Sequence, residues 1–179
     1  ATGTQIWDVT NQGTPVLVLG SLGSARWQYI NFTPSGGLNY LYAVNGTDAP
    51  VHYNGTSWVN PSLTGGPSVG TLINISVWKR RIWFVESGST SAWYLGTDAI
   101  AGALTEFDIG ALLKKGGFLN AIGTLTVDGG NGPDDLLVLM SSRGETVIYK
   151  GTDPTNANAF ALVGVFALPP PIGRRCVID

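Results

Sequence analysis

The sequence predicts an all-β fold built from repeated four-stranded antiparallel sheets. Gly contributes 25 of the 179 residues and Pro contributes 10, whereas charged residues make up only 12% of the chain. This composition is typical of short strands joined by tight turns, and it disfavours long helices and disordered segments. A Tyr-x-Gly-Thr motif also occurs three times, beginning at Tyr53, Tyr94 and Tyr149. A recurring motif of this kind indicates one supersecondary unit used several times along the chain.

Each of these tyrosines lies eleven residues after the middle of an apolar run, at Tyr42, Trp83 or Val138. The interval stays constant inside the units, although the distance from one Tyr to the next varies. We therefore expect each pair to mark the second and third strands of one unit, with loops of different length between units. The residues expected to carry the packing of the repeated units are Tyr42, Tyr53, Trp83, Trp93, Tyr94 and Tyr149.

The first unit is predicted around the apolar run that contains Tyr42. Its four strands are expected at residues 27–32, 40–44, 51–53 and 57–59. The second strand carries apolar residues at consecutive positions, which is typical of a strand covered on both faces. Asn45 and Gly46 follow it, and a glycine supplies the positive φ that a tight turn needs.

The second and third units repeat this pattern. The strands of the second unit are expected at residues 72–78, 81–85, 91–95 and 104–109. Those of the third unit are expected at residues 119–127, 136–140, 146–150 and 160–166. Gly88 and Gly144 mark the turns between the second and third strands of these units. Between the two units, residues 109–115 indicate a single helical turn that ends at Gly116.

The two ends of the chain look like parts of further units. Residues 5–9 and 16–19 match the last half of a preceding unit, and Trp7 precedes Tyr53 by 46 residues, about one repeat length. The predicted division of the chain is residues 1–24 (end of a preceding unit), 25–66, 67–110, 111–168 (a unit with a polar insertion at 127–135) and 169–179 (start of a further unit).

Four-stranded units of about 40–50 residues with a clustered aromatic are typical of a β-propeller. One blade cannot bury both of its faces alone, so neighbouring blades must stack on it. The chain holds fewer units than the roughly four blades that close the smallest ring. The sequence therefore predicts an incomplete propeller that belongs to a longer one, and a β-sandwich built from the same hairpins is the alternative.

Few residues indicate catalysis, a cofactor or a metal. His52 is the only histidine, and without a nucleophile motif or a second histidine it is interpreted as structural. Cys176 is the only cysteine, so an internal disulfide and a thiolate metal cluster are excluded. No glycine motif for a phosphate or a dinucleotide opens a helix. We therefore expect no enzyme activity, no cofactor and no metal.

Two groups of acidic residues offer alternatives to that expectation. The polar insertion contains four candidate calcium ligands, Asp128, Asn131, Asp134 and Asp135. Their spacing does not match a calcium loop of the EF-hand type, and a solvated loop is favoured. Three glutamates at strand ends or turns are candidates for the acid pair of a glycosidase, namely Glu86, Glu106 and Glu145. That reaction needs two carboxyl groups in one cleft, which the sequence alone does not indicate.

Basic residues cluster at positions 79–81, 114–115 and 174–175. Such clusters either face nucleic acid or keep strand edges soluble, and the net charge of −2 favours the second interpretation. A surface this poor in charge is often covered in part by a partner. No apolar run reaches the ~18 residues of a membrane span, so no membrane partner is expected.

Several segments together resemble a widespread family of tailed-bacteriophage and prophage structural proteins. They are the runs at residues 41–46 and 81–86, the segment 92–117, the polar sequence 128–135, and the segments 149–154 and 171–176. The resemblance covers nearly the whole chain and implies a propeller-bearing component of the tail tube, the nozzle or the DNA-stabilising plug. It provides no catalytic residues to transfer to this chain.

The functional expectation is a non-enzymatic virion component of the tail or head–tail region, assembled in the cytoplasm of the bacterial host. The resemblance implies a homo-oligomer around the DNA path, with other tail or portal-proximal proteins as partners and non-specific contact with DNA. The alternative is a carbohydrate-binding module in which Trp58 or Trp93 stacks on glycans of the host surface.

Overall fold

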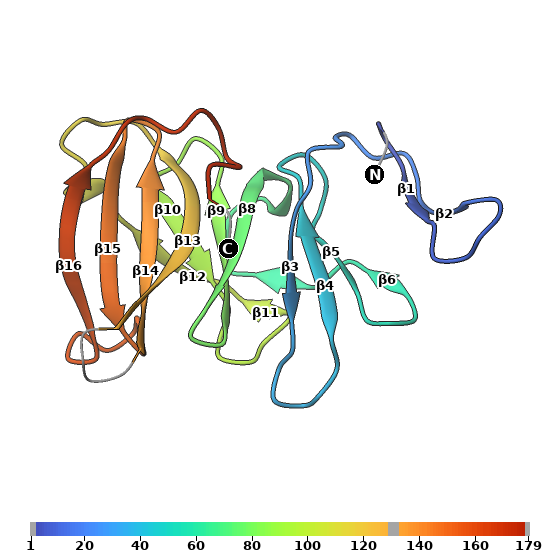
Figure 1. Cartoon of the computed structure of the whole chain (residues 1–179), viewed down its shortest axis with the longest axis horizontal. Coiled ribbons are helices and arrows are strands. Elements are labelled where there is room, and N and C mark those ends of the chain that lie inside the picture. Colours follow the sequence, from blue (N-terminus) through green and yellow to red (C-terminus); the bar gives the residue numbers. More distant parts are fainter. Residues whose placement is uncertain (1–2, 129–132, 178–179) are drawn as a thin grey trace.

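The computed structural model describes residues 3–128 and 133–177, and within them the all-β prediction is confirmed. Figure 1 shows three antiparallel sheets side by side, with a short hairpin beyond the first sheet. Two short 3₁₀ turns are the only helical elements in these two ranges. None of the described helices has the length or the apolar character needed to span a lipid bilayer.

The N-terminal hairpin and the first sheet occupy the right-hand half of Figure 1. The hairpin pairs β1 (Ile6–Asp8) with β2 (Val16–Leu19). The first sheet consists of β3 (Gln28–Phe32), β4 (Tyr40–Val44), β5 (Val51–Tyr53) and β6 (Trp58–Val59). These four strands pair in chain order, so the sheet is an antiparallel meander.

The second sheet lies in the middle of the molecule. It consists of β8 (Leu72–Trp78), β9 (Arg81–Glu86), β10 (Ser91–Tyr94) and β12 (Thr105–Asp108), again paired in chain order. The 3₁₀ turn η1 (Val69–Thr71) leads into β8. A short parallel ladder between β7 (Leu63–Thr64) and β11 (Gly102–Ala103) joins the loops of the first and second sheets.

The third sheet is the longest and follows the 3₁₀ turn η2 (Gly110–Leu112). It consists of β13 (Leu119–Asp128), β14 (Pro133–Ser141), β15 (Glu145–Gly151) and β16 (Phe160–Ala167). Its pairing also follows chain order. The last strand, β16, is an edge strand in the described part of the chain, and it contains only apolar residues and one glycine.

The strands of all three sheets lie close to their predicted positions, with ends that differ by a few residues. The helical turn expected at residues 109–115 is confined to η2. The insertion expected at residues 127–135 is shorter than predicted, because β13 continues to Asp128 and β14 begins at Pro133. The candidate ligand Asn131 and the rest of residues 129–132 lie outside the described residues.

Apolar clusters fill the spaces between neighbouring sheets. The first strands lie next to one another, β3 beside β8 and β8 beside β13. One cluster joins the first and second sheets, a second joins the second and third sheets, and a smaller third cluster joins the first sheet to the N-terminal hairpin. Each sheet therefore hides apolar surface of the next, which is the main favourable contribution to folding.

Strand β9 shows why the second sheet needs a neighbour on each side. Its consecutive residues Ile82, Trp83, Phe84 and Val85 are all fully buried. Because successive side chains of a strand point to opposite faces, Ile82 and Phe84 enter the cluster shared with the first sheet. Trp83 and Val85 enter the cluster shared with the third sheet.

Trp83 lies at the centre of a group of aromatic rings between the second and third sheets. Its ring centroid lies 4.6 Å from that of Tyr94, 5.9 Å from that of Phe107 and 6.1 Å from that of Trp78. Phe107 continues the contact to Tyr149 of the third sheet, with 5.1 Å between the ring centroids. Edge-to-face and offset rings at such distances stabilise a core beyond the area that they bury.

The eleven-residue interval does not mark equivalent positions in the three sheets, which corrects the sequence-based alignment. Tyr94 lies opposite Trp83 in the strand register, but Tyr53 lies opposite Leu41 and Tyr149 opposite Leu137. An offset of one residue turns a side chain to the other face of its sheet. Tyr94 accordingly packs toward the following sheet, whereas Tyr149 packs toward the preceding one.

The offset arises in the turn between the second and third strands. In the second sheet this turn contains an even number of residues between the paired positions Val85 and Ala92, and in the other two sheets the number is odd. In the second sheet, Trp93 and not Tyr94 therefore points to the same side as Tyr53 and Tyr149 do in their sheets. It lies opposite Phe84 and packs against the cluster shared with the first sheet.

The outer face of the third sheet is apolar and has no sheet against it in the described part of the chain. Leu137, Leu139 and Val147 point toward the second sheet, so the side chains next to them in these strands point outward. We call this outward side the terminal face. It is formed by Leu125, Leu136, Val138, Met140, Ile148 and Phe166. Its two most exposed side chains are Leu125 and Phe166, each 47% exposed.

After β16 the chain turns back toward the middle of the molecule (Figure 1). The Leu168 amide donates a hydrogen bond to the Gly144 carbonyl at 2.7 Å, and the Cys176 sulfur lies 3.5 Å from that of Met140. The side chains of Arg174 and Arg175 then reach the chain just before and at the start of the first sheet. The C-terminal segment thus connects the third sheet with the first.

Replacing Trp83 with Ala is expected to lower the free energy of unfolding by about 3–5 kcal/mol, because the change leaves a large cavity among the aromatic rings. Denaturant unfolding followed by circular dichroism measures this loss. Trp7→Ala is the control, since Trp7 is 37% exposed and should cost far less. A loss below ~1 kcal/mol in Trp83→Ala would contradict the central place of this residue in the core.

Candidate functional site

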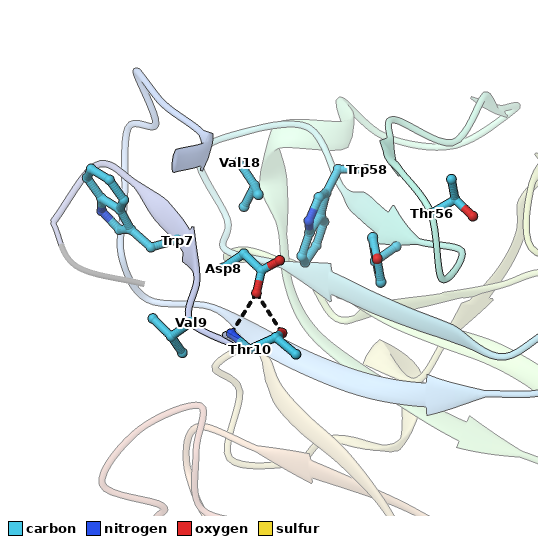
Figure 2. Close-up of a pocket in the computed structure, with 8 residues that line it drawn as sticks. Trp7, Asp8, Val9, Thr10, Val18, Thr56 and Trp58 are labelled. Carbon is cyan, nitrogen blue, oxygen red and sulfur yellow. Dashed lines mark hydrogen bonds between the residues drawn. The ribbon is translucent and has the colours of Figure 1, made fainter. Parts of the chain in front are cut away.

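An aromatic hollow of about 340 Å³ lies between the N-terminal hairpin and the outer strands of the first sheet (Figure 2). Trp7 and Asp8 reach it from β1, and Tyr53 and Trp58 reach it from β5 and β6. Val9, Thr10, Val18 and Thr56 complete its wall. Figure 2 shows Asp8 pointing toward Trp58, whereas the Trp7 ring lies on the other side of β1. The hollow thus combines the Tyr53 and Trp58 rings with one carboxylate.

The polar groups of this hollow are held by local hydrogen bonds. The Asp8 carboxylate accepts hydrogen bonds from the hydroxyl and the backbone amide of Thr10, at 2.6 and 2.8 Å, and these bonds lower the pKa of Asp8. The Tyr53 hydroxyl donates to the Gly55 carbonyl at 2.8 Å. The rings of Tyr53 and Trp58 lie 5.4 Å apart with a tilt of 36°. Exposed ring faces next to an ionised carboxylate are suited to a sugar, which offers C–H faces and hydroxyl donors.

A second hollow of about 410 Å³ lies between the first strands of the three sheets and the C-terminal segment. Gln28 and Ile30 of β3, Ile75 of β8 and Ile122 of β13 are among its lining residues. Asn74 of β8 ties these parts together. Its amide oxygen accepts a hydrogen bond from the Ile122 amide at 3.1 Å, and its amide nitrogen donates to the Arg174 carbonyl at 3.2 Å.

The three predicted basic clusters differ in their surroundings. Lys79 lies 3.8 and 3.7 Å from carboxylate oxygens of Asp134 and Asp135, two of the candidate calcium ligands. Arg80 and Arg81 pair with Asp98 and Asp153, at 2.6 and 3.1 Å. The exposed Lys114 and Lys115 donate their backbone amides to the Glu145 carboxylate, at 3.0 and 2.8 Å. Arg174 and Arg175 instead lie beside Arg26.

The three candidate acids for glycoside hydrolysis each have a separate partner. Glu86 accepts a hydrogen bond from the Trp93 indole at 3.1 Å, and Glu106 accepts one from the Ser91 hydroxyl at 2.6 Å. Glu145 is buried and accepts the two backbone amides just described. The described residues also contain no group of three histidine, cysteine or carboxylate side chains placed to hold a metal ion.

His52 is buried in the first sheet and is 7% exposed. Its ring centroid lies 5.2 Å from that of Tyr40 and 5.8 Å from that of Tyr42. Its Nδ1 atom has no hydrogen-bond partner among the described residues. Burial away from water therefore lowers the pKa of His52, because the charged imidazolium loses its solvation.

The residues predicted to carry the repeat lie in the cores and around the aromatic hollow. Tyr42 and Trp93 belong to the cluster between the first and second sheets, and Trp83, Tyr94 and Tyr149 to that between the second and third. Tyr53 lines the hollow. Sequence reasoning did not identify Asp8 or Arg26 as site residues. Both residues lie outside the repeated motif, and each shares its pocket with residues that are distant in the sequence.

Comparison of the chain with protein-family models, with curated proteins and with solved structures found no match. The resemblance to tailed-phage proteins therefore rests on the sequence motifs.

Replacing His52 with Phe is expected to reduce the loss of stability on acidification. The unfolded chain takes up a proton near the ordinary pKa of 6.5, whereas folded His52 resists protonation. Its contribution to stability is thus complete above that pH and is lost as the pH falls toward the lower folded-state pKa. Urea unfolding of both proteins between about pH 5 and 8 measures the difference. The carboxylates change the stability of both proteins alike. Parallel curves of unfolding free energy against pH would therefore show that His52 does not titrate as described.

Proposed function

We propose that this chain is a non-enzymatic structural subunit that assembles through the uncovered faces of its stacked sheets. The terminal face carries this proposal. In the first sheet the corresponding face presents Tyr42 and Val44, which the second sheet covers. In the second sheet it presents Trp83 and Val85, which the third sheet covers. The terminal face has the same apolar character, and no sheet covers it in the described part of the chain. An apolar face of this kind favours a partner.

The partner in this proposal is a second copy of the chain. The N-terminal hairpin lies at the opposite end of the molecule (Figure 1). It also exposes apolar side chains. Val9 is 70% exposed, Val16 63% and Leu17 46%. Contact between this end of one copy and the terminal face of the next is head-to-tail, and such contacts build rings when the rotation closes.

Within the subunit, the sheets act as blades of an incomplete β-propeller in this proposal. Three features support the arrangement: four-stranded meanders in chain order, first strands that lie side by side, and the hollow between those first strands. Any one pair of sheets also fits the β-sandwich alternative. The burial of β9 from both sides favours the propeller, because its sheet is covered by a neighbour on each face.

The phage setting is the next step of the proposal and is supported by the sequence resemblance. In a tail or head–tail assembly, such a subunit has a mechanical role, in which rigid stacked sheets present loops to neighbouring subunits around the DNA path. A ring of head-to-tail copies suits that role, because every subunit offers the same two surfaces.

Replacing Phe166 with Glu is expected to weaken self-association, because the change places a charge on the terminal face. Light scattering coupled to size-exclusion chromatography, over a range of protein concentrations, measures the oligomeric state. We expect the unmodified protein to associate and Phe166→Glu to shift toward the monomer at the same concentration. Leu38→Glu is the matched control, since Leu38 is 57% exposed in a loop away from this face. A strict monomer at high concentration would refute the proposal.

A carbohydrate-binding module is a second candidate function, and the aromatic hollow supports it. Trp58, one of the two tryptophans expected to stack on glycans, lines this hollow together with Trp7 and Asp8. Trp93, the other, packs against the cluster between the first and second sheets and donates its indole N–H to Glu86. The hollow therefore narrows this hypothesis to Trp58, with the Asp8 carboxylate beside it.

If the hollow binds a sugar, Trp58→Ala should lower glycan binding by about tenfold or more, because the change removes a ring that stacks on the ligand. A glycan array followed by titration calorimetry with the best ligand measures this loss. Tyr29→Ala is the control, because Tyr29 is 68% exposed and does not line this hollow. An array without any signal, or equal losses in Trp58→Ala and Tyr29→Ala, would count against this function.

A further inference from the structure

Three arginines from the two ends of the chain meet beside the first sheet. Arg26 precedes β3, and Arg174 and Arg175 lie in the C-terminal segment. Together with Ala25 and Gly173 they line a pocket of about 260 Å³. The structure thus gathers three positive charges around one concave surface.

Hydrogen bonds to backbone carbonyls hold two of these arginines in place. The Arg174 guanidinium donates to the carbonyls of Arg26 and Asn45, at 3.0 and 2.9 Å. The Arg175 guanidinium donates to the Trp27 carbonyl at 2.6 Å. These bonds all use Nη2 atoms, and a guanidinium has five N–H donors, so each side chain keeps donors for a further ligand.

Carbonyl partners orient a guanidinium without neutralising its charge. Among the described residues, no carboxylate forms an ion pair with Arg26, Arg174 or Arg175. Burial, and then the positive charges of Arg26 and Arg175, hold the pKa of Arg174 below its ordinary value. An arginine still stays protonated at neutral pH, so the three charges repel one another unless an anion lies between them.

The basic cluster around β9 provides a direct contrast. Lys79, Arg80 and Arg81 each have an aspartate partner, as a structural surface cluster normally does. The arginine pocket has no such compensation among the described residues, although it lies in a chain with a net charge of −2. The difference distinguishes the arginine pocket from a basic patch that only keeps an edge soluble.

We propose that the pocket formed by Arg26, Arg174 and Arg175 binds a phosphate group, with the sugar–phosphate backbone of a nucleic acid as its source. Guanidinium groups suit this ligand because their planar N–H donors match the phosphate oxygens in pairs. Binding through phosphates is independent of base sequence. The inference deepens the proposed function, because it assigns to named residues the non-specific contact with DNA expected for a subunit around a DNA path.

The position of the pocket agrees with this role. Arg175 lines both the arginine pocket and the hollow between the first strands of the three sheets. A backbone phosphate in the pocket therefore lies next to the innermost strands, where a propeller-like ring has its axis.

Arg26→Gln is the most informative variant. It removes one charge, and the Arg26 side chain donates no hydrogen bond to another described residue, so the variant leaves the bonds of Arg174 to the two carbonyls in place. Fluorescence anisotropy of a labelled double-stranded oligonucleotide, titrated with the protein at several salt concentrations, measures binding. We expect a loss of affinity of about five- to tenfold and a salt-dependence slope that falls by roughly one. Arg26→Lys, which keeps the charge, should recover part of the loss.

Lys114→Gln is the matched control, because it removes the same charge from an exposed residue whose described hydrogen bond uses only the backbone amide. A parallel titration with inorganic phosphate, followed by calorimetry, separates the two sources of the ligand. Arg26-dependent binding of phosphate without binding of the oligonucleotide would keep the phosphate site and assign it to a free anion. Equal losses in Arg26→Gln and Lys114→Gln, or no binding of either probe, would overturn the proposal. Phe166→Glu should still bind the oligonucleotide, so failure of assembly and failure of the arginine pocket are distinguishable.

Discussion

Burial of the second sheet from both sides is the constraint on which the rest of this structure depends. Four consecutive residues of β9, from Ile82 to Val85, are fully buried, and the alternation of a strand sends two of them to each face. No single neighbour can cover both faces. A sheet stands on each side of it as a result, and removing either would expose a row of large apolar side chains to water.

The same requirement, applied to the two end sheets, accounts for the surfaces proposed to act in assembly. The β1–β2 hairpin covers the outward face of the first sheet only in part. The remaining space between hairpin and sheet is the aromatic hollow lined by Asp8 and Trp58. The terminal face of the third sheet has no sheet against it in the described part of the chain. Structural packing and the proposed function therefore use one type of surface, which is the apolar face of a four-stranded meander.

Two polar side chains connect segments that lie far apart in the sequence. Asn74 connects β8, β13 and the C-terminal segment through its amide, and Arg174 connects that segment to the start of the first sheet. The other carboxylates of the described side chains are engaged by nearby basic side chains, hydroxyls, an indole or backbone amides, as Glu86, Glu106 and Glu145 illustrate. The arginine pocket is the exception, since its charges meet carbonyls and one another.

The sequence by itself determined most of the strand positions, because these follow from local patterns of apolar residues and glycine turns. It therefore located the strands of all three sheets, the hairpin and the burial of Trp83. It did not predict the parallel ladder of β7 and β11, which forms between two loops that are distant in the sequence. It did not determine which face of its sheet each repeated aromatic occupies. One residue more or less in a turn reverses that face. For this reason Trp93, and not Tyr94, points to the same side of its sheet as Tyr53 and Tyr149 do. Only the tertiary structure brings Arg26 next to Arg174 and Arg175. Arg26 and Arg174 are 148 residues apart, and they come together because whole sheets pack against one another. Such a contact leaves no periodic signal in the sequence.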